Sequence, residues 1–125
     1  MKCNDTIPQK PGDDADVFEV CPVARAFEIV GSKWRLIVLR CLQLWGEQRF
    51  TELQEASTAD SATLSRVLDE LGEQDLVERR LEDQPIRTYY SLTDRGEDLA
   101  DVFEAYEEWS LEWTDAEAPA QQATD

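Results

Sequence analysis

The chain has 125 residues and a formal net charge of −16, with 28 acidic side chains, 12 basic ones and no histidine. This length suits one domain and is too short for two independent hydrophobic cores. A hydrophobic content of 42% supports a packed core despite 32% charged residues, which excludes a wholly disordered chain. Its longest apolar run is far below the roughly 20 residues of a transmembrane helix, so no membrane-spanning helix is predicted.

The two ends of the chain differ from its middle in composition. Residues 1–15 contain two prolines, a glycine and the pair Asp13-Asp14, which predicts a flexible N-terminal arm. The folded domain is predicted to occupy residues 16–113, and residues 114–125 are predicted to form a flexible acidic tail. No internal repeat is visible.

Two helices are predicted in the first part of the domain. Apolar residues at helical spacing predict a helix up to Val30, and Gly31-Ser32 interrupts the pattern, which resumes at Trp34 and ends before Gly46. The stripe of the first helix consists of Val23, Ala26, Phe27 and Val30. The second helix carries apolar residues on more than one face, so we expect it at the centre of the fold.

Two shorter helical patterns follow. Thr51 and Gln54 have the spacing of a capping box, which predicts that the first of these helices begins at Thr51. The second pattern opens with the polar residues Thr58, Asp60 and Ser61. An apolar stripe on this second helix can bury against the first helix and consists of Leu64, Val67, Leu68 and Leu71.

The opposite face of the second short helix has the composition of a helix that enters the major groove of DNA. Small and polar side chains allow close approach, and Arg66 can donate to guanine. The candidate DNA-binding residues of this recognition helix are Ser61, Ala62, Thr63, Ser65 and Arg66. A solvated face without any ligand has a similar composition, and this pattern alone favours neither interpretation.

A β-hairpin is predicted next. Two strand-like runs, residues 76–81 and 86–92, flank the polar turn Glu82-Asp83-Gln84-Pro85. Three clustered arginines lie on or beside this hairpin and could bind backbone phosphates: Arg79, Arg80 and Arg87. The alternative interpretation is that they form salt bridges with Glu78, Glu82 and Asp83. We favour phosphate contact.

The last predicted helix is capped by Thr93 and carries a long apolar stripe: Leu99, Val102, Phe103, Tyr106, Trp109 and Trp113. A single small domain cannot easily cover this much aromatic surface, which predicts dimerisation through the first and last helices. The candidate dimer-interface residues are Val23, Phe27, Phe103, Tyr106, Trp109 and Trp113.

The motifs as an ordered set resemble the HxlR-type winged helix-turn-helix transcriptional regulators, within the wider MarR-like group. The similarity extends over residues 21–113. Its markers are Cys21-Pro22, Gly31-Ser32-Lys33-Trp34, Arg49-Phe50-Thr51-Glu52-Leu53, Leu64 to Leu71, Leu76-Val77-Glu78-Arg79 and Tyr90-Ser91-Leu92-Thr93-Asp94-Arg95-Gly96.

The resemblance implies a mainly α fold with a small β-hairpin wing. It further implies a homodimer that pairs through its terminal helices, a recognition helix at residues 60–73 in the major groove and a wing at residues 76–92 on the adjacent backbone. Asp75 departs from the family, which usually has glycine before the first wing strand. Aspartate tolerates the left-handed conformation better than most residues, so we expect the turn to survive.

The three cysteines are an odd number without a signal peptide, which predicts free thiols in a reducing cytoplasm. Cys3 falls in the predicted arm, and Cys41 is expected to act as a small buried hydrophobe. Cys21 precedes Pro22 at a helix start, where the dipole stabilises a thiolate. The resemblance implies a sensor of oxidants or electrophiles here, acting through a disulfide across the dimer or an adduct. A packing cysteine under the dimer helices is an equally strong alternative.

Acidic residues are concentrated away from the candidate DNA-binding face. Residues 33–95 hold nine of the twelve basic residues against twelve acids, whereas residues 96–125 hold ten acids and no base. Concentrated cations screen such an excess of carboxylates, which indicates a salt-rich cytoplasm and a halophilic, archaeal host. The alternative is an ordinary acidic protein that does not touch DNA.

No catalytic constellation competes with DNA binding. The chain lacks histidine, zinc-type cysteine spacing and a glycine-rich loop, so neither an enzyme nor a metal or other cofactor is predicted. We therefore predict a cytoplasmic, homodimeric, sequence-specific DNA-binding transcriptional regulator with Cys21 as a candidate redox switch. Two alternatives stay open: constitutive repression without sensing, and a winged-helix interaction module that binds a basic protein partner instead of DNA.

Overall fold

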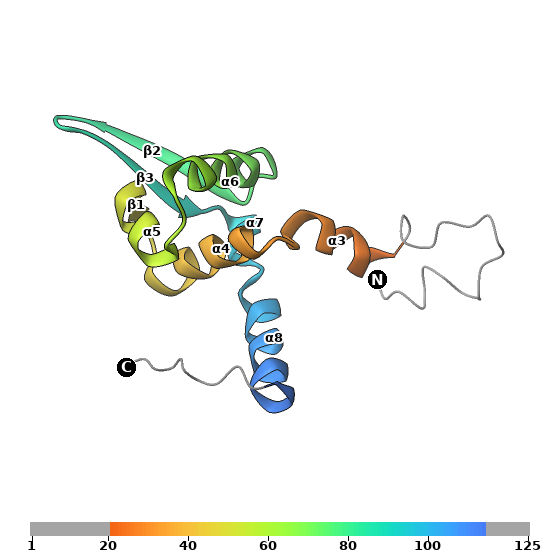
Figure 1. The fold of residues 1–125 in the computed structure, drawn as a ribbon. Helices are drawn as coiled ribbons and strands as arrows, with labels where there is room; N and C mark the ends of the chain where they lie inside the picture. Colours follow the sequence, from red (N-terminus) through yellow and green to blue (C-terminus); the bar gives the residue numbers. More distant parts are fainter. Residues whose placement is uncertain (1–20, 115–125) are drawn as a thin grey trace.

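The computed structural model describes residues 21–114, which form a helical domain with one three-stranded antiparallel sheet (Figure 1). The predicted flexible arm, the start of the domain at residue 16 and the tail beyond Thr114 lie outside the described residues. The elements in chain order are α3 (Pro22–Val30), α4 (Lys33–Trp45), β1 (Gln48–Arg49), α5 (Phe50–Ser57), α6 (Ser61–Glu73), β2 (Val77–Asp83), β3 (Ile86–Leu92), α7 (Asp94–Glu97) and α8 (Ala100–Trp113). The predicted winged helix-turn-helix class is confirmed.

Helix α4 lies at the centre of the core, as its apolar pattern predicts. Val38, Leu39 and Leu42 are at most 2% exposed. They belong to one buried cluster with the stripe of α6, which consists of Leu64, Val67, Leu68 and Leu71. Burying one such side chain is worth about 1.5–3 kcal/mol, so this cluster fixes which face of α6 is left for solvent.

The interruption between α3 and α4 falls where the sequence predicts it. A Cβ atom on Gly31 would lie 2.3 Å from the carbonyl oxygen of Phe27, so only glycine fits this close approach. Ser32 then caps α4, and its hydroxyl accepts a hydrogen bond of 3.4 Å from the amide of Arg35. Helix α3 therefore does not continue α4 and extends away from the core (Figure 1).

The predicted capping box at Thr51 is wrong. Helix α5 begins at Phe50, and the amide of Arg49 donates to Oε1 of Glu52 at 2.8 Å. The helix starts earlier because of a short strand that the sequence pattern did not reveal. This strand, β1, pairs with β3 and places Arg49 opposite Tyr89. Because this pairing holds Arg49 extended, the helix starts one residue earlier and Glu52 becomes the reciprocal capping residue.

Helix α6 begins at Ser61 with Asp60 as its cap. The Oδ1 atom of Asp60 accepts from the amide of Thr63 at 2.7 Å, and this bond lowers the pKa of the Asp60 carboxyl. Thr58 ends α5 instead of opening α6, because it adopts a left-handed conformation with φ of 63°. The tight connection fixes the first turn of α6 relative to α5.

The wing is a longer hairpin than the sequence predicts. Its seven cross-strand pairs run from Val77 opposite Leu92 to Asp83 opposite Ile86, in a sheet of order β1-β3-β2. Glu82 and Asp83 therefore lie in β2, and the loop is reduced to Gln84-Pro85, joined by a cis peptide bond. The tip of the hairpin projects beyond the helices (Figure 1).

Asp75 occupies the left-handed turn before β2, as expected, with φ of 60°. Its amide donates to the carbonyl of Gly72 at 3.0 Å, and its own carbonyl accepts from the Thr93 hydroxyl at 2.7 Å. The turn therefore survives without glycine and links the end of α6 to the end of the wing.

The predicted single helix after Thr93 is divided into two. Thr93 caps the short helix α7, accepting from the amide of Gly96 at 3.0 Å, and the chain then turns at residues 98–99 before α8 begins. A Cβ atom on Gly96 would lie 2.3 Å from the carbonyl oxygen of Leu76. Because Gly96 has no side chain, α7 can pack against the base of the wing. Helix α8 extends away from this base (Figure 1).

Candidate nucleic-acid interface

The solvent-facing side of α6 carries the residues that the sequence analysis assigns to base contact. Ser61, Ala62, Ser65 and Arg66 are exposed, whereas Thr63 is half-buried. The Arg66 side chain is 59% exposed. Because four leucine and valine side chains hold the opposite face in the core, this face of small side chains and one arginine is the one that a groove could receive.

Arg66 belongs to an ion-pair network that the sequence analysis did not predict. Its Nη1 lies 3.0 Å from Oε2 of Glu70, and Oε1 of Glu70 lies 3.0 Å from Nη2 of Arg35. The hydrogen bonds from Arg35 and then from Arg66 lower the pKa of Glu70. The spacing of four residues between Arg66 and Glu70 signals half of this network, but nothing local connects Arg35 to it.

The three wing arginines do not form one cluster. Side chains alternate along a strand, so Arg79 and Arg80 lie on opposite faces of the hairpin. Arg79 pairs with Tyr90, on the face that includes Val77, whereas Arg80 pairs with Tyr89. Arg87 pairs with Glu82 and therefore shares the face of Arg80.

Arg80 is engaged by acidic partners within the chain. Its guanidinium lies 2.9 Å from Glu47 and 2.9 Å from Glu82, and it stacks 4.4 Å from the ring centroid of Tyr89. The hydrogen bonds that Arg80 donates to both carboxylates raise the pKa of its guanidinium, and they lower the pKa of Glu47. Arg80 thus forms the salt bridge with Glu82 that the alternative interpretation named, and its second partner, Glu47 next to the end of α4, was not predicted.

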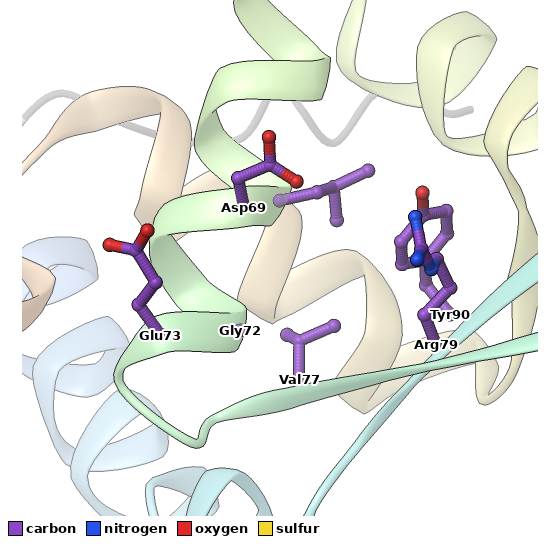
Figure 2. Close-up of a pocket in the computed structure, with 7 residues that line it drawn as sticks. Asp69, Gly72, Glu73, Val77, Arg79 and Tyr90 are labelled. Carbon is purple, nitrogen blue, oxygen red and sulfur yellow. The ribbon is translucent and has the colours of Figure 1, made fainter.

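Arg87 and Arg79 make no ion pair within the described residues, and both are exposed. Arg79 borders a groove of about 390 Å³ between α6 and the hairpin. Figure 2 shows Asp69 and Glu73 on the helix side of this groove and Arg79 with Tyr90 on the strand side. Two carboxylates make the groove unfavourable for a phosphate, so Arg87 is the better placed cation for a DNA backbone.

The two described cysteines differ in state. Cys21 is the N-cap of α3 with Pro22 in the first turn, as predicted, but it is disulfide-bonded. The expected free thiol is therefore wrong for Cys21, since an odd number of cysteines still leaves room for one disulfide. Cys41 is free and 7% exposed, and burial raises the pKa of its thiol, as expected of a small core residue.

Helices α3 and α8 expose a band of large apolar side chains, here called the terminal-helix surface: Val23, Phe27, Val102, Tyr106, Trp109 and Trp113, each between 56% and 69% exposed. An apolar groove of about 370 Å³ lies between the two helices and is also lined by Leu36 of α4. Phe103, assigned from sequence to the dimer interface, is instead 9% exposed within the core. One turn of α8 thus anchors the helix, and the rest of its apolar stripe is uncovered.

Two further observations concern metal binding and membrane spanning, and both apply to residues 21–114. That part of the chain contains no group of three metal-ligating side chains. Of its helices, none combines the length and the apolar character needed to cross a membrane.

Comparison with known proteins places this geometry among DNA-binding folds. Residues 29–118 match the sequence profile of a family described as HxlR-like helix-turn-helix. The chain is 37% identical over 101 residues to the HTH-type transcriptional regulator YvaP of Bacillus subtilis, covering 78% of this chain and 92% of YvaP. The reduced form of the transcriptional regulator YodB from B. subtilis has a TM-score of 0.68 at 28% identity, covering 76% of this chain and 95% of YodB. The redox regulator HypR in its reduced form has a TM-score of 0.67 at 28% sequence identity, covering 73% of this chain and 91% of HypR.

Proposed function

Because the chain belongs to the HxlR-like helix-turn-helix family, we propose that it is a sequence-specific DNA-binding transcriptional regulator that acts as a homodimer. The observation that carries this proposal is the exposed face of α6, where small side chains surround a single arginine above a fully buried stripe. A protein of this function works on the chromosome, so we place it in the cytoplasm.

In the proposed complex, the first turns of α6 enter the major groove. Ser61, Ala62 and Ser65 allow close approach, Thr63 lies at the side of the helix, and Arg66 donates to a base edge. Arg87 binds a backbone phosphate, which sets the position of the wing without selecting sequence. Arg80 has a different role: its pair with Glu47 holds the wing against the end of α4, whereas its pair with Glu82 lies within the strand β2.

The terminal-helix surface is the proposed dimer interface. Val23 and Phe27 from α3 lie with Tyr106, Trp109 and Trp113 from α8 as exposed apolar side chains, and buried aromatic residues are typical interface anchors. A two-fold axis through this surface would present two copies of α6 to half-sites about one turn of DNA apart, roughly 34 Å.

Cys21 is the proposed redox or electrophile switch. Its position at the start of α3 favours thiol reactivity, its sulfur already takes part in a disulfide, and α3 carries part of the proposed dimer interface. A change at this sulfur could therefore alter how the two copies of α6 are spaced. A packing role beneath the terminal helices is the alternative.

The acidic composition supports a further proposal about the host. Residues 96–125 hold ten acids and no base, which disfavours DNA binding at low ionic strength. Concentrated potassium screens this repulsion, so we propose a halophilic, archaeal host in which the protein binds DNA at high salt.

The test is a gel shift with the protein's own promoter region and with a randomised DNA pool, in concentrated potassium chloride, using reduced and oxidised protein. We expect specific binding that changes on oxidation. The change should be absent in Cys21→Ser and kept in Cys41→Ala, because Cys41 is buried. Binding that ignores oxidation would reject the switch and leave a regulator without thiol sensing.

One observation favours a second function, a winged-helix module that binds a basic protein partner. Helix α8 carries five acidic side chains and no basic one. Failure to select any sequence from the randomised pool would support this module and reject the DNA-binding regulator.

A further inference from the structure

Arg35 connects three helices of the domain, α3, α4 and α6. It lies in the first turn of α4, and its Nη1 donates to the carbonyl oxygens of Ile29 at 2.6 Å and Glu28 at 3.4 Å. These carbonyls belong to the last turn of α3, which lacks helical partners for them. The opposite edge of the same guanidinium donates to Glu70 of α6, through Nε at 3.1 Å and Nη2 at 3.0 Å.

Glu70 uses both carboxylate oxygens. Oε1 accepts from Arg35, and Oε2 accepts from Nη1 of Arg66 at 3.0 Å. The side chains of Arg35 and Glu70 are 20% and 29% exposed, whereas that of Arg66 is 59% exposed. The half-buried Arg35 therefore fixes the position of the Glu70 carboxylate, and this carboxylate in turn orders the more exposed Arg66 side chain.

Among residues 21–114, Arg66 contacts an acceptor through one nitrogen only. A guanidinium has five N–H donors, and the contact through Nη1 leaves Nε and Nη2 for another acceptor. Two adjacent donors suit the O6 and N7 acceptors of guanine in the major groove. A long side chain that is already ordered loses less rotamer freedom when it binds.

We propose that Arg35 and Glu70 are positioning residues that hold Arg66 for base contact and connect it to the C-terminal end of α3. This inference rests on the proposed function, because Arg66 needs DNA as its ligand. These contacts form a continuous bridge that runs from the α3 carbonyls through Arg35 and Glu70 to Arg66. Helix α3 also carries two side chains of the terminal-helix surface, so a shift of α3 would reach the base-contacting arginine through this bridge.

An exposed pair four residues apart on a helix usually contributes little. The difference here is the second arginine, which contacts Glu70 through two nitrogens from another helix. Removing Arg66 leaves the Arg35–Glu70 pair intact, whereas removing Arg35 releases the carboxylate that orders Arg66. A solvated pair without function would not show this asymmetry in DNA selectivity.

The experiment uses the full-length protein and a DNA site selected from a randomised pool by the wild type. Dissociation constants are then measured for that site and for duplexes carrying each single base-pair change. We expect Arg66→Ala to lower discrimination at one base pair by about fivefold to 150-fold. Glu70→Gln and Arg35→Gln should lower discrimination at the same base pair by about twofold to tenfold, the lower part of the range for coupled neighbours.

The double variants separate positioning from a general structural role. Once Arg66 is alanine, adding Glu70→Gln or Arg35→Gln should leave discrimination at that base pair unchanged. Asp69→Asn is the matched control, because it removes the same charge from the adjacent position of α6 and should strengthen binding to all duplexes alike.

Two results would overturn the proposal: discrimination unchanged in both single variants, or losses that add independently to that of Arg66→Ala. Thermal melting checks that each variant is folded, and Arg35→Lys replaces Arg35→Gln if the latter unfolds. Failure of the wild type to select any site is a different outcome, since it would reject the proposed function itself together with this inference.

Discussion

Helices α6 and α8 have nearly the same length, 13 and 14 residues, and both carry an apolar stripe. On α6 the whole stripe is covered, with four side chains at most 3% exposed. On α8 only Phe103 is buried, while Tyr106, Trp109 and Trp113 are more than half exposed. The same kind of pattern therefore builds the core in one helix and leaves an uncovered surface in the other.

The polar faces of the two helices differ as well. The outer face of α6 begins with small side chains and Arg66, whereas α8 carries five acids and no base. An acidic helix repels phosphate, and a face of small residues with an arginine accepts it. Burial thus indicates which surface needs a protein partner, and charge indicates which surface can approach DNA.

The largest expected effect lies in the covered stripe. Leu64→Ala should lower the free energy of unfolding by about 2–5 kcal/mol, because Leu64 is fully buried and its truncation leaves a cavity. Chemical denaturation measures this change. The matched control is Leu111→Ala on α8, where 55% exposure predicts a change within about 0.5 kcal/mol. Equal losses in the two variants would remove the distinction between the helices.

Substitutions in the uncovered stripe of α8 should change the affinity of the dimer and leave the folding of each subunit intact. Trp109→Ala is expected to weaken the dimer by about 2–4 kcal/mol, the range for an aromatic anchor, as measured by sedimentation at several concentrations. Trp45→Ala is the control, because Trp45 is exposed to a similar degree, 58% against 56%, but lies at the end of α4, close to the short strand β1. A dimer weakened equally by both changes would place the interface elsewhere.

Sequence alone predicts the parts of this fold that depend on local pattern. The stripe of α6 and the central position of α4 follow from spacing and apolar content. The left-handed turn at Asp75 follows from the family resemblance together with the tolerance of aspartate for φ of 60°. The exposed side chains of the candidate interface could also be named, since a buried stripe determines its opposite face.

Pairings between distant segments could not be predicted in the same way. The strand β1 is two residues long, and its pairing with β3 moved the start of α5 away from Thr51. One partner of Arg80 and one partner of Glu70 come from positions 33 and 35 residues away. Strand register, which pairs Arg87 with Glu82 and so places Arg87 on the face of Arg80, likewise cannot be read from the positions of the charges.

The wing provides a smaller effect that sharpens the charge comparison. Arg87→Ala should weaken binding to all DNA sequences alike and flatten the plot of log affinity against log salt by about 0.9 for each phosphate that is no longer neutralised, or about 1.8 per dimer. Arg80→Ala should leave that slope nearly unchanged, because Glu47 and Glu82 already occupy its guanidinium. Titrations of a fluorescent duplex over a series of potassium chloride concentrations measure both slopes. An equal flattening would mean that the Arg80 pairs open on DNA.

The smallest expected effect concerns acid stability. Because Arg35 and then Arg66 lower the pKa of Glu70, its contribution to stability is fully present above the unfolded-state pKa of about 4.3 and is lost as pH falls through the lower folded-state pKa. The free energies of unfolding of the wild type and Glu70→Gln should therefore differ near neutral pH and converge in acid. In an Arg35→Gln background the difference should be smaller at neutral pH, since the main cause of the lowered pKa is gone. If Glu70→Gln changed the free energy of unfolding by the same amount at every pH in both backgrounds, Arg35 would not hold this carboxylate in solution. Helix α6 would then lack its connection to α3.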